Sequence, residues 1–209
     1  VWTPSFVAFG TYRGGLSVID DGAVRTTQWA NRLDFFGNLA LTGSERFVFG
    51  FRPLDETVDG QRLFSGYSAS TPGERGVVDQ LNFDWNTVSH LFFEGELGEL
   101  FPGLDDDDRR GLDIGFSVGR QPISFQEGLL INDSIDAIGI TRNNFKPGNA
   151  VNLRFTGLYS WNEVNRNTPS VTTSVRNLEA QSAHLVGGFT EIDFESMTMA
   201  IDVIYIRGG

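Results

Sequence analysis

The segment Asn-Arg-Leu-Asp-Phe-Phe-Gly-Asn-Leu-Ala-Leu-Thr, residues 31–42, decides the fold because its residue types alternate with a period of two. Apolar residues or glycine occupy the odd-numbered positions Leu33, Phe35, Gly37, Leu39 and Leu41. The even-numbered positions add polarity, with Arg32, Asp34, Asn38 and Thr42 beside Phe36 and Ala40. Since successive side chains of a β-strand point to opposite faces, the segment is predicted to be a strand with one apolar and one polar face.

The same alternation recurs along the chain and predicts an all-β protein. The composition agrees, because 25 glycines and 18 phenylalanines among 209 residues favour strands and turns over helices. No segment predicts a helix. We expect nine strands, at residues 5–20, 31–42, 46–52, 81–101, 111–119, 135–142, 151–161, 182–194 and 197–205.

The hairpin between the second and third expected strands can be aligned by parity. Paired residues face the same side of a sheet, and the apolar positions are odd-numbered on both strands. A three-residue loop, Gly43–Glu45, satisfies this condition. It pairs Leu41 with Phe47, Leu39 with Phe49 and Gly37 with Phe51.

Connections of two lengths fall at opposite ends of an up-and-down strand order. Gly43–Glu45, Asn143–Asn149 and Phe194–Ser196 are short, whereas Asp55–Asp79 and Glu163–Ala180 are long and polar. Short turns at one end and long loops at the other are typical of outer-membrane β-barrels. No change in composition marks a domain boundary, so residues 1–209 are expected to form a single β-barrel domain or the N-terminal part of one.

Strand length and the polar face favour a membrane barrel over a soluble β-sandwich, whose strands also alternate. Most of the expected strands run about 10–15 residues, whereas soluble strands are commonly about 5–6 residues long and tilted membrane strands need about 9–11. Mixed charges suit a water-filled lumen better than a packed core. Only a closed barrel pairs all the backbone polar groups of strands in lipid. We therefore expect an antiparallel up-and-down transmembrane β-barrel, or an incomplete arc of a larger one.

Two segments resemble Gram-negative outer-membrane barrels of the porin and alginate-export type. These are Trp29–Pro53, and Val118-Gly-Arg-Gln-Pro-Ile-Ser-Phe125 with the following Glu-Gly-Leu-Leu-Ile-Asn-Asp133. The resemblance implies an outer-membrane location, diffusive transport through a charged lumen and no enzyme chemistry. Such barrels have an even strand number and end on an aromatic residue, whereas we expect nine strands before Gly208-Gly209. This departure predicts the N-terminal portion of a larger barrel.

The polar face supplies the candidate site, a pore lining. By parity and position it consists of Arg32, Asp34, Asn38, Arg46, Arg52, Asn82, Asp84, Glu94, Asp113 and Arg154. The arginines either select anionic or sugar-like solutes or simply pair with the acidic residues. Arg120 shares the parity of the lipid-facing Val118, so it must lie at the rim or follow a β-bulge; Pro122 supports a break there. Aromatic residues near strand ends suggest interfacial girdles: Trp2, Trp29, Trp85, Trp161, Tyr12, Tyr159 and Tyr205.

Composition excludes several classes of protein. Sixteen basic and 27 acidic residues give a net charge of −11, which argues against nucleic-acid binding, and the absence of cysteine excludes disulfides and thiol catalysis. Asp105, Asp106, Asp107 and Asp108 could bind Ca²⁺, but they lack the ligand spacing of an EF-hand, so a solvated turn is preferred. Glu94 and Glu96 have the residue types of a glycosidase pair but are interpreted as lumen carboxylates. We expect no catalytic residue, metal or cofactor.

The preferred functional interpretation is an outer-membrane channel of a Gram-negative bacterium for passive diffusion or export of hydrophilic solutes. Its expected partners are outer-membrane lipid and small hydrophilic solutes, with a lipoprotein or further copies of the chain as additional partners. Two alternatives stay open. One is a barrel that serves as a scaffold for a partner protein or surface complex without transport. The other is a secreted soluble β-sandwich that binds glycans.

Overall fold

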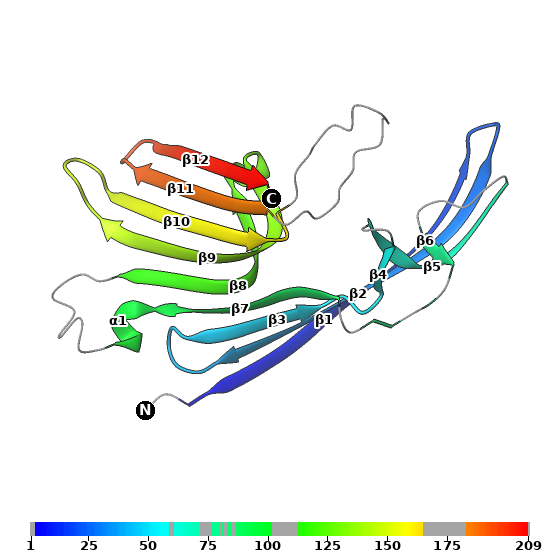
Figure 1. Cartoon of the computed structure of the whole chain (residues 1–209), viewed down its shortest axis with the longest axis horizontal. Helices are drawn as coiled ribbons and strands as arrows, with labels where there is room; N and C mark the ends of the chain where they lie inside the picture. The colour runs from blue at the N-terminus through cyan, green and yellow to red at the C-terminus, as the bar shows by residue number, and fades with distance from the viewer. Residues whose placement is uncertain are drawn as a thin grey trace.

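A computed structural model describes residues 3–58, 61–71, 77–79, 81, 83–84, 87–101, 113–164 and 183–208. Twelve strands form a single sheet, which is drawn in Figure 1 as a curled, open arc with β12 at one edge and β1 near the other. Strands β1 and β12 do not pair, so the sheet is not closed. The chain is therefore all-β, as predicted. Within the described ranges, no helix is both long and apolar enough to cross a membrane.

The main path of the sheet is antiparallel and up-and-down. It is built from β1 (Ser5–Asp20), β2 (Arg25–Ala40), β3 (Arg46–Phe51), β7 (Val88–Glu96), β8 (Ile114–Phe125), β9 (Ile131–Phe145), β10 (Asn152–Asn162), β11 (Ala183–Asp193) and β12 (Thr198–Gly208). Each of the nine expected strands overlaps one of these. The turns after β2, β9 and β11 lie at the same end of the sheet, on the left of Figure 1, as the connection lengths predicted.

The segment Asp55–Asp79 was predicted to be a loop, and that prediction is wrong. It contains β4 (Asp55–Val58), β5 (Gln61–Thr71) and the short β6 (Val77–Asp79). Strand β5 pairs with the first half of β2, from Arg25 to Asn31, whereas β3 pairs with the second half. The partner strand of β2 is thus split into two pieces by an excursion through β4.

Two predicted strands have different bounds in the structure. The expected strand 81–101 is shorter, because β7 begins at Val88 and is followed by the helical turn α1 (Leu97–Leu100). The expected strand 111–119 continues to Phe125, so the strand is longer than its alternating pattern. In the first segment the apolar pattern extends beyond the paired strand at both ends, and in the second the paired strand extends beyond the apolar pattern.

The predicted register of the β2–β3 hairpin is wrong by two residues. Leu39 pairs with Phe47, Gly37 with Phe49 and Phe35 with Phe51. The loop is longer than three residues and is closed by a hydrogen bond from the Leu41 backbone N–H to the Glu45 carbonyl, 2.9 Å. A shift of two preserves parity, so every side chain still lies on its expected face. The ring of Phe49 rather than Phe51 covers Gly37, where a Cβ atom would collide with it.

The register defines two continuous faces of the sheet. The outer face carries the odd-numbered residues of β2, β3, β10 and β12 and their partners, among them Tyr12, Phe93, Ile138 and Val203. None of its described large apolar side chains is buried; many are exposed, up to 74% for Leu16 and 70% for Val203, and the others are half-buried. The inner face carries the opposite set, including Asp34, Glu94, Thr156 and Phe189.

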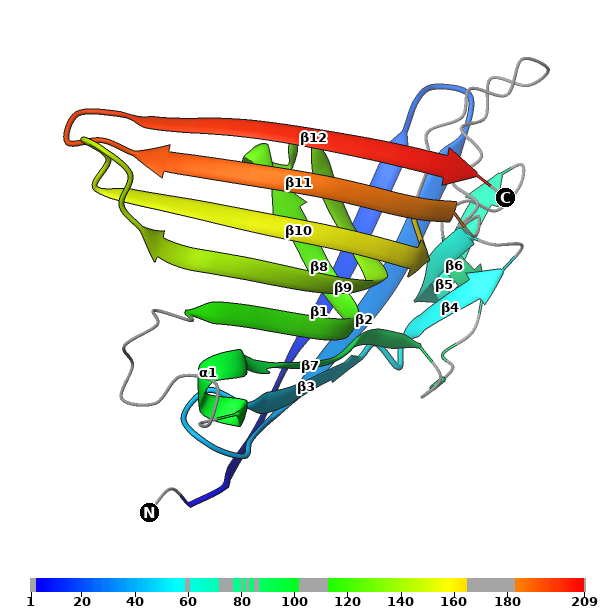
Figure 2. The same ribbon diagram turned by 60° about the vertical axis from the view of Figure 1, so that its left-hand side comes forward.

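The core lies on the inner face because the β8–β9 hairpin bends over it. The hairpin keeps one register from Ile114 paired with Arg142 to Phe125 paired with Ile131. Figure 2 shows its far half passing behind β10–β12. Residues from both layers make the buried cluster: Ile135, Ala137, Leu158, Val164, Ala183, Leu185 and Phe189, with Ile123, Phe125, Ile131 and Ile204 packed against it. This folded-over half was not predicted.

Candidate functional site: a charged inner face

The candidate site is the charged part of the inner face on β1, β2 and β3. Asp34 lies at its centre with only 5% of its side chain exposed. Three guanidinium groups surround this carboxylate, from Arg52 at 2.9 Å, Arg32 at 3.3 Å and Arg13 at 3.7 Å. Three positive charges and one negative charge give these four residues a formal charge of +2. We call Arg13, Arg32, Asp34 and Arg52 the arginine cluster.

The topology explains why the arginine cluster forms. Arg13 and Arg32 are direct partners in the β1–β2 register, and Asp34 lies two residues from Arg32 on the same face. Arg52 follows the last residue of β3, which pairs with Phe35. Like charges directly opposite each other destabilise a sheet, so the buried Asp34 carboxylate offsets the repulsion between the guanidinium groups.

Two further ion pairs lie on the inner face away from the arginine cluster. Arg46 donates to Glu94, its direct partner across β3 and β7. Arg154 donates to Glu191, its direct partner across β10 and β11, at 2.6 Å. Each pair is neutral as a unit, so these arginines are charge-compensated, which was one of the two interpretations of the inner arginines.

The predicted pore-lining residues divide into three groups. Arg32, Asp34, Asn38, Arg46, Glu94 and Arg154 lie on the inner face, and the contact with Asp34 places Arg52 there too. Asp84 and Asp113 are not in strands: Asp84 lies before β7, and its backbone N–H donates to the Pro53 carbonyl, whereas Asp113 precedes β8 and accepts from the Asn144 amide. Asn82 and Asp105–Asp108 fall outside the described residues.

The inner face is less uniformly polar than expected. Asn38 has the apolar partners Val7 and Val48 on its two neighbouring strands. The rings of Phe9 and Phe36 stack nearby with centroids 5.4 Å apart. The bent hairpin covers much of the same face farther along, over β10–β12. Exposed polar groups of the inner face therefore lie mainly on β1, β2, β3, β7 and the start of β8, and Arg154 and Glu191 on β10 and β11 also stay exposed.

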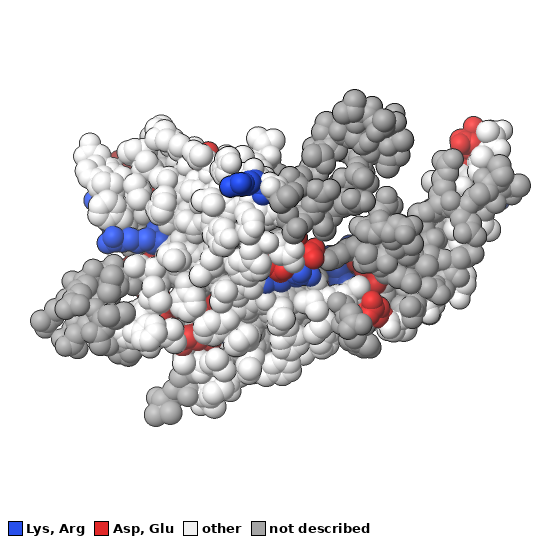
Figure 3. All heavy atoms as spheres, in the orientation of Figure 1, with Lys and Arg blue, Asp and Glu red and all other residues white. Residues whose placement is uncertain are grey.

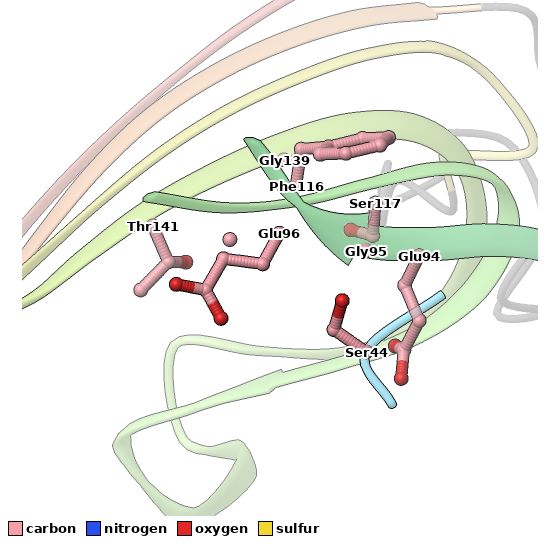
Figure 4. Close-up of a pocket in the computed structure, with 9 residues that line it drawn as sticks. Ser44, Glu94, Gly95, Glu96, Phe116, Ser117, Gly139 and Thr141 are labelled. Carbon is pink, nitrogen blue, oxygen red and sulfur yellow. The ribbon is translucent and has the colours of Figure 1, made fainter. Parts of the chain in front are cut away.

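A shallow pocket of about 330 Å³ lies on this exposed stretch, between the β2–β3 turn and β7–β9 (Figure 4). Its polar lining includes Ser44, Glu94, Glu96, Ser117 and Thr141. Figure 4 shows the carboxylates of Glu94 and Glu96 directed apart, and Glu94 is bound by Arg46. The two carboxylates do not converge on one point, so the pocket does not have the geometry of a glycosidase pair.

A second polar cluster marks the bend of the β8–β9 hairpin. Gly119 adopts φ +124°, a conformation that other residues rarely adopt. The next residue, Arg120, binds both carboxylate oxygens of its partner Asp136, at 2.8 and 3.0 Å. Glu163 and Asn162 complete the cluster, at 3.2 Å from Arg120 and 2.9 Å from Asp136. Arg120 thus lies at the bend where the sequence predicted a break, and its charge is compensated.

The described inner face presents fixed charged groups and a shallow polar pocket. In the part of the chain that the structure describes, no three His, Asp or Glu side chains converge as metal ligands. The arginine cluster, the neutral ion pairs and the shallow pocket are instead fixed groups on one wall of a curved sheet. Comparison with protein-family models, curated proteins and solved structures found no match to this chain.

Proposed function

We propose that this chain forms the wall of an outer-membrane β-barrel through which hydrophilic solutes diffuse passively. The observation that supports the proposal most is the composition of the outer face. From Phe6 to Val18 on β1, from Thr27 to Leu39 on β2 and from Met199 to Tyr205 on β12, the described outer-face positions hold no Asp, Glu, Lys, Arg or His. On β3 and β7–β11 the outer-face positions hold no charged or basic residue except Arg142, His184 and the Arg120–Asp136 pair at the bend.

The size of this apolar face is difficult to reconcile with water as its solvent. Exposed apolar patches on soluble monomers rarely exceed a few hundred Å², and larger ones mark contacts with proteins or membranes. Here exposed side chains such as Leu16, Leu91, Ile140 and Val203 occur on strands across the whole sheet. No second layer packs on them within the described residues, which counts against a soluble β-sandwich that would bury these side chains in its core.

The inner face provides the polar wall that such a channel needs. Its arginine cluster has a formal charge of +2, which favours anionic or sugar-like solutes over cations in this part of the lumen. The ion pairs Arg46–Glu94 and Arg154–Glu191 contribute no net charge. The preference for anions therefore depends on Arg13, Arg32 and Arg52.

One observation favours the scaffold alternative as a second candidate. The bent β8–β9 hairpin occupies the inner face of β10–β12, where Gln126 donates to Asp202 at 2.8 Å. A hairpin held there narrows the space available to solutes. A barrel that is filled in this way can support a partner protein without conducting.

Two measurements test the proposal. The purified chain is expected to require detergent to stay monodisperse, because the outer face is apolar, and to raise the conductance of a planar bilayer. Solubility as a monomer without detergent would overturn the membrane assignment. Insertion into lipid without any conductance would instead support the scaffold candidate.

A further inference from the structure

A small group of polar and aromatic side chains interrupts the apolar outer face at one end. His184 and Arg207 are direct partners across β11 and β12. They form the next outer-face pair after the apolar pair Val186 and Tyr205, two residues along each strand. This end is opposite the short turns, and therefore at the end of the long connections. Figure 3 shows a mostly uncharged surface over β9–β12, with basic groups only near its two ends.

Tyr159 joins His184 to the neighbouring strand. The Tyr159 hydroxyl lies 3.0 Å from Nδ1 of His184, and the two rings stack at 6.0 Å with planes 12° apart. Trp161 lies beside Tyr159, with ring centroids 6.3 Å apart. With Nδ1 engaged by Tyr159, Nε2 is the His184 nitrogen available to a ligand.

Arg207 differs from the arginines of the arginine cluster, of the two inner-face ion pairs and of the hairpin bend. Arg13, Arg32, Arg46, Arg52, Arg120 and Arg154 all lie within salt-bridge distance of a carboxylate. In the described part of the chain no carboxylate lies that close to Arg207, which is exposed. Partners in a sheet have Cβ atoms about 5 Å apart, so one anion can contact both His184 and Arg207.

We propose that Arg207 and His184 bind the phosphate of a membrane-lipid headgroup, with Tyr159 orienting the His184 ring and with Trp161 and Tyr205 against the adjoining acyl chains. The proposal rests on the membrane location proposed above. A guanidinium group binds phosphate through two parallel hydrogen bonds, and the Nε2–H of His184 adds a further donor when the Tyr159 hydroxyl donates to Nδ1. Tyrosine and tryptophan prefer the level of the headgroups at a membrane interface. The uncompensated charge thus lies where the apolar face meets an anionic headgroup layer.

The opposite end of the same face supplies a matched control. Arg142 also interrupts the apolar outer face, near the short turn between β9 and β10, and its guanidinium lies 5.6 Å from the centre of the Phe145 ring. Its direct partners in the sheet, Ile114 and Phe155, are apolar, whereas the direct partner of Arg207 is His184. Arg142→Gln removes the same charge from the same face without changing the proposed site.

The test uses the chain in neutral detergent micelles. Binding of a brominated phosphatidate and of a brominated, phosphate-free galactolipid is followed by quenching of tryptophan fluorescence. Arg207→Gln and His184→Gln are expected to weaken phosphatidate binding by about tenfold, as loss of a charge-assisted contact implies, and to leave galactolipid binding unchanged. Arg142→Gln is expected to change neither by more than about twofold.

Three outcomes overturn the proposal. Equal binding of both lipids by the wild-type chain would show that phosphate is not recognised. Displacement of phosphatidate by inorganic phosphate alone would identify free phosphate as the ligand. If Arg142→Gln weakened phosphatidate binding as much as Arg207→Gln does, the binding would depend on the total charge of the outer face and not on the proposed site. Failure to enter micelles at all would overturn the membrane proposal instead, and circular dichroism of each variant confirms that the sheet is intact.

Discussion

Phe125 and Phe189 stack face to face, with ring centroids 3.4 Å apart and planes 6° from parallel. Phe125 is the last residue of β8, and Phe189 lies in the middle of β11. The two strands are not neighbours in the sheet, because β9 and β10 lie between them. The contact exists only because the β8–β9 hairpin folds across the inner face, so this ring pair holds the hairpin down.

Phe189→Ala is therefore expected to release the hairpin and destabilise the fold. Truncation of a buried phenylalanine costs about 3–5 kcal/mol of unfolding free energy, since it removes apolar contacts and leaves a cavity. Urea denaturation in detergent micelles measures the loss. Val203→Ala on the exposed outer face serves as the control and is expected to cost less than about 1 kcal/mol. Equal losses in the two variants would show that the hairpin is not held by this contact.

The bend itself depends on Gly119. Its φ of +124° disfavours any side chain, and an added Cβ atom would collide with the carbonyl oxygen of Leu91 on β7. Gly119→Ala is expected to lower the free energy of unfolding by about 1–3 kcal/mol, the cost of a strained backbone conformation. In Gly115→Ala, on the same strand, the new Cβ atom meets no atom closer than 3.9 Å. That variant should unfold close to the wild-type urea concentration, and a loss equal to that of Gly119→Ala would contradict the role of the bend.

Alternation was sufficient to predict the class of fold, the approximate positions of the main strands and the face of most side chains. The period of two depends only on the pleat of the strand, so the predicted face of a side chain stays correct even where the predicted strand register is wrong by two residues. The hairpin after β2 illustrates this, because Gly37 pairs with Phe49 rather than Phe51 and both have the same parity. Parity cannot distinguish loops that differ by two residues.

The folded-over hairpin could not be predicted in the same way. Gly119, Arg120 and Pro122 indicated a break in the strand, but the direction of the bend is set by contacts with Phe189 and Leu185, more than 60 positions along the chain. The same holds for the arginine cluster, which needs Arg52 beside Asp34 across a strand pair. The position of each residue on a face is local information, whereas the grouping of charges depends on the register.

The ion pair at the bend should be energetically coupled. Arg120 and Asp136 are 21% and 17% exposed, and they share two hydrogen bonds. A double-mutant cycle with Arg120→Gln and Asp136→Asn is expected to give a coupling of about 1–3 kcal/mol in the free energy of unfolding. The pair Arg154–Glu191 is more exposed, at 49% and 38%, so the corresponding cycle should give less than about 1 kcal/mol. A larger coupling in the exposed pair would contradict this assignment.

Ion selectivity provides the last test, and the charges of the inner face determine its expected direction. Arg52→Glu replaces one of the three cations around Asp34, which changes the formal charge of the arginine cluster from +2 to zero. The reversal potential across a planar bilayer with a salt gradient is expected to shift toward cation preference. Arg46→Glu places a carboxylate against Glu94 and should shift it in the same direction. Arg142→Glu, on the outer face, should leave the reversal potential unchanged, and a shift there as large as in Arg52→Glu would exclude the arginine cluster as the selective element.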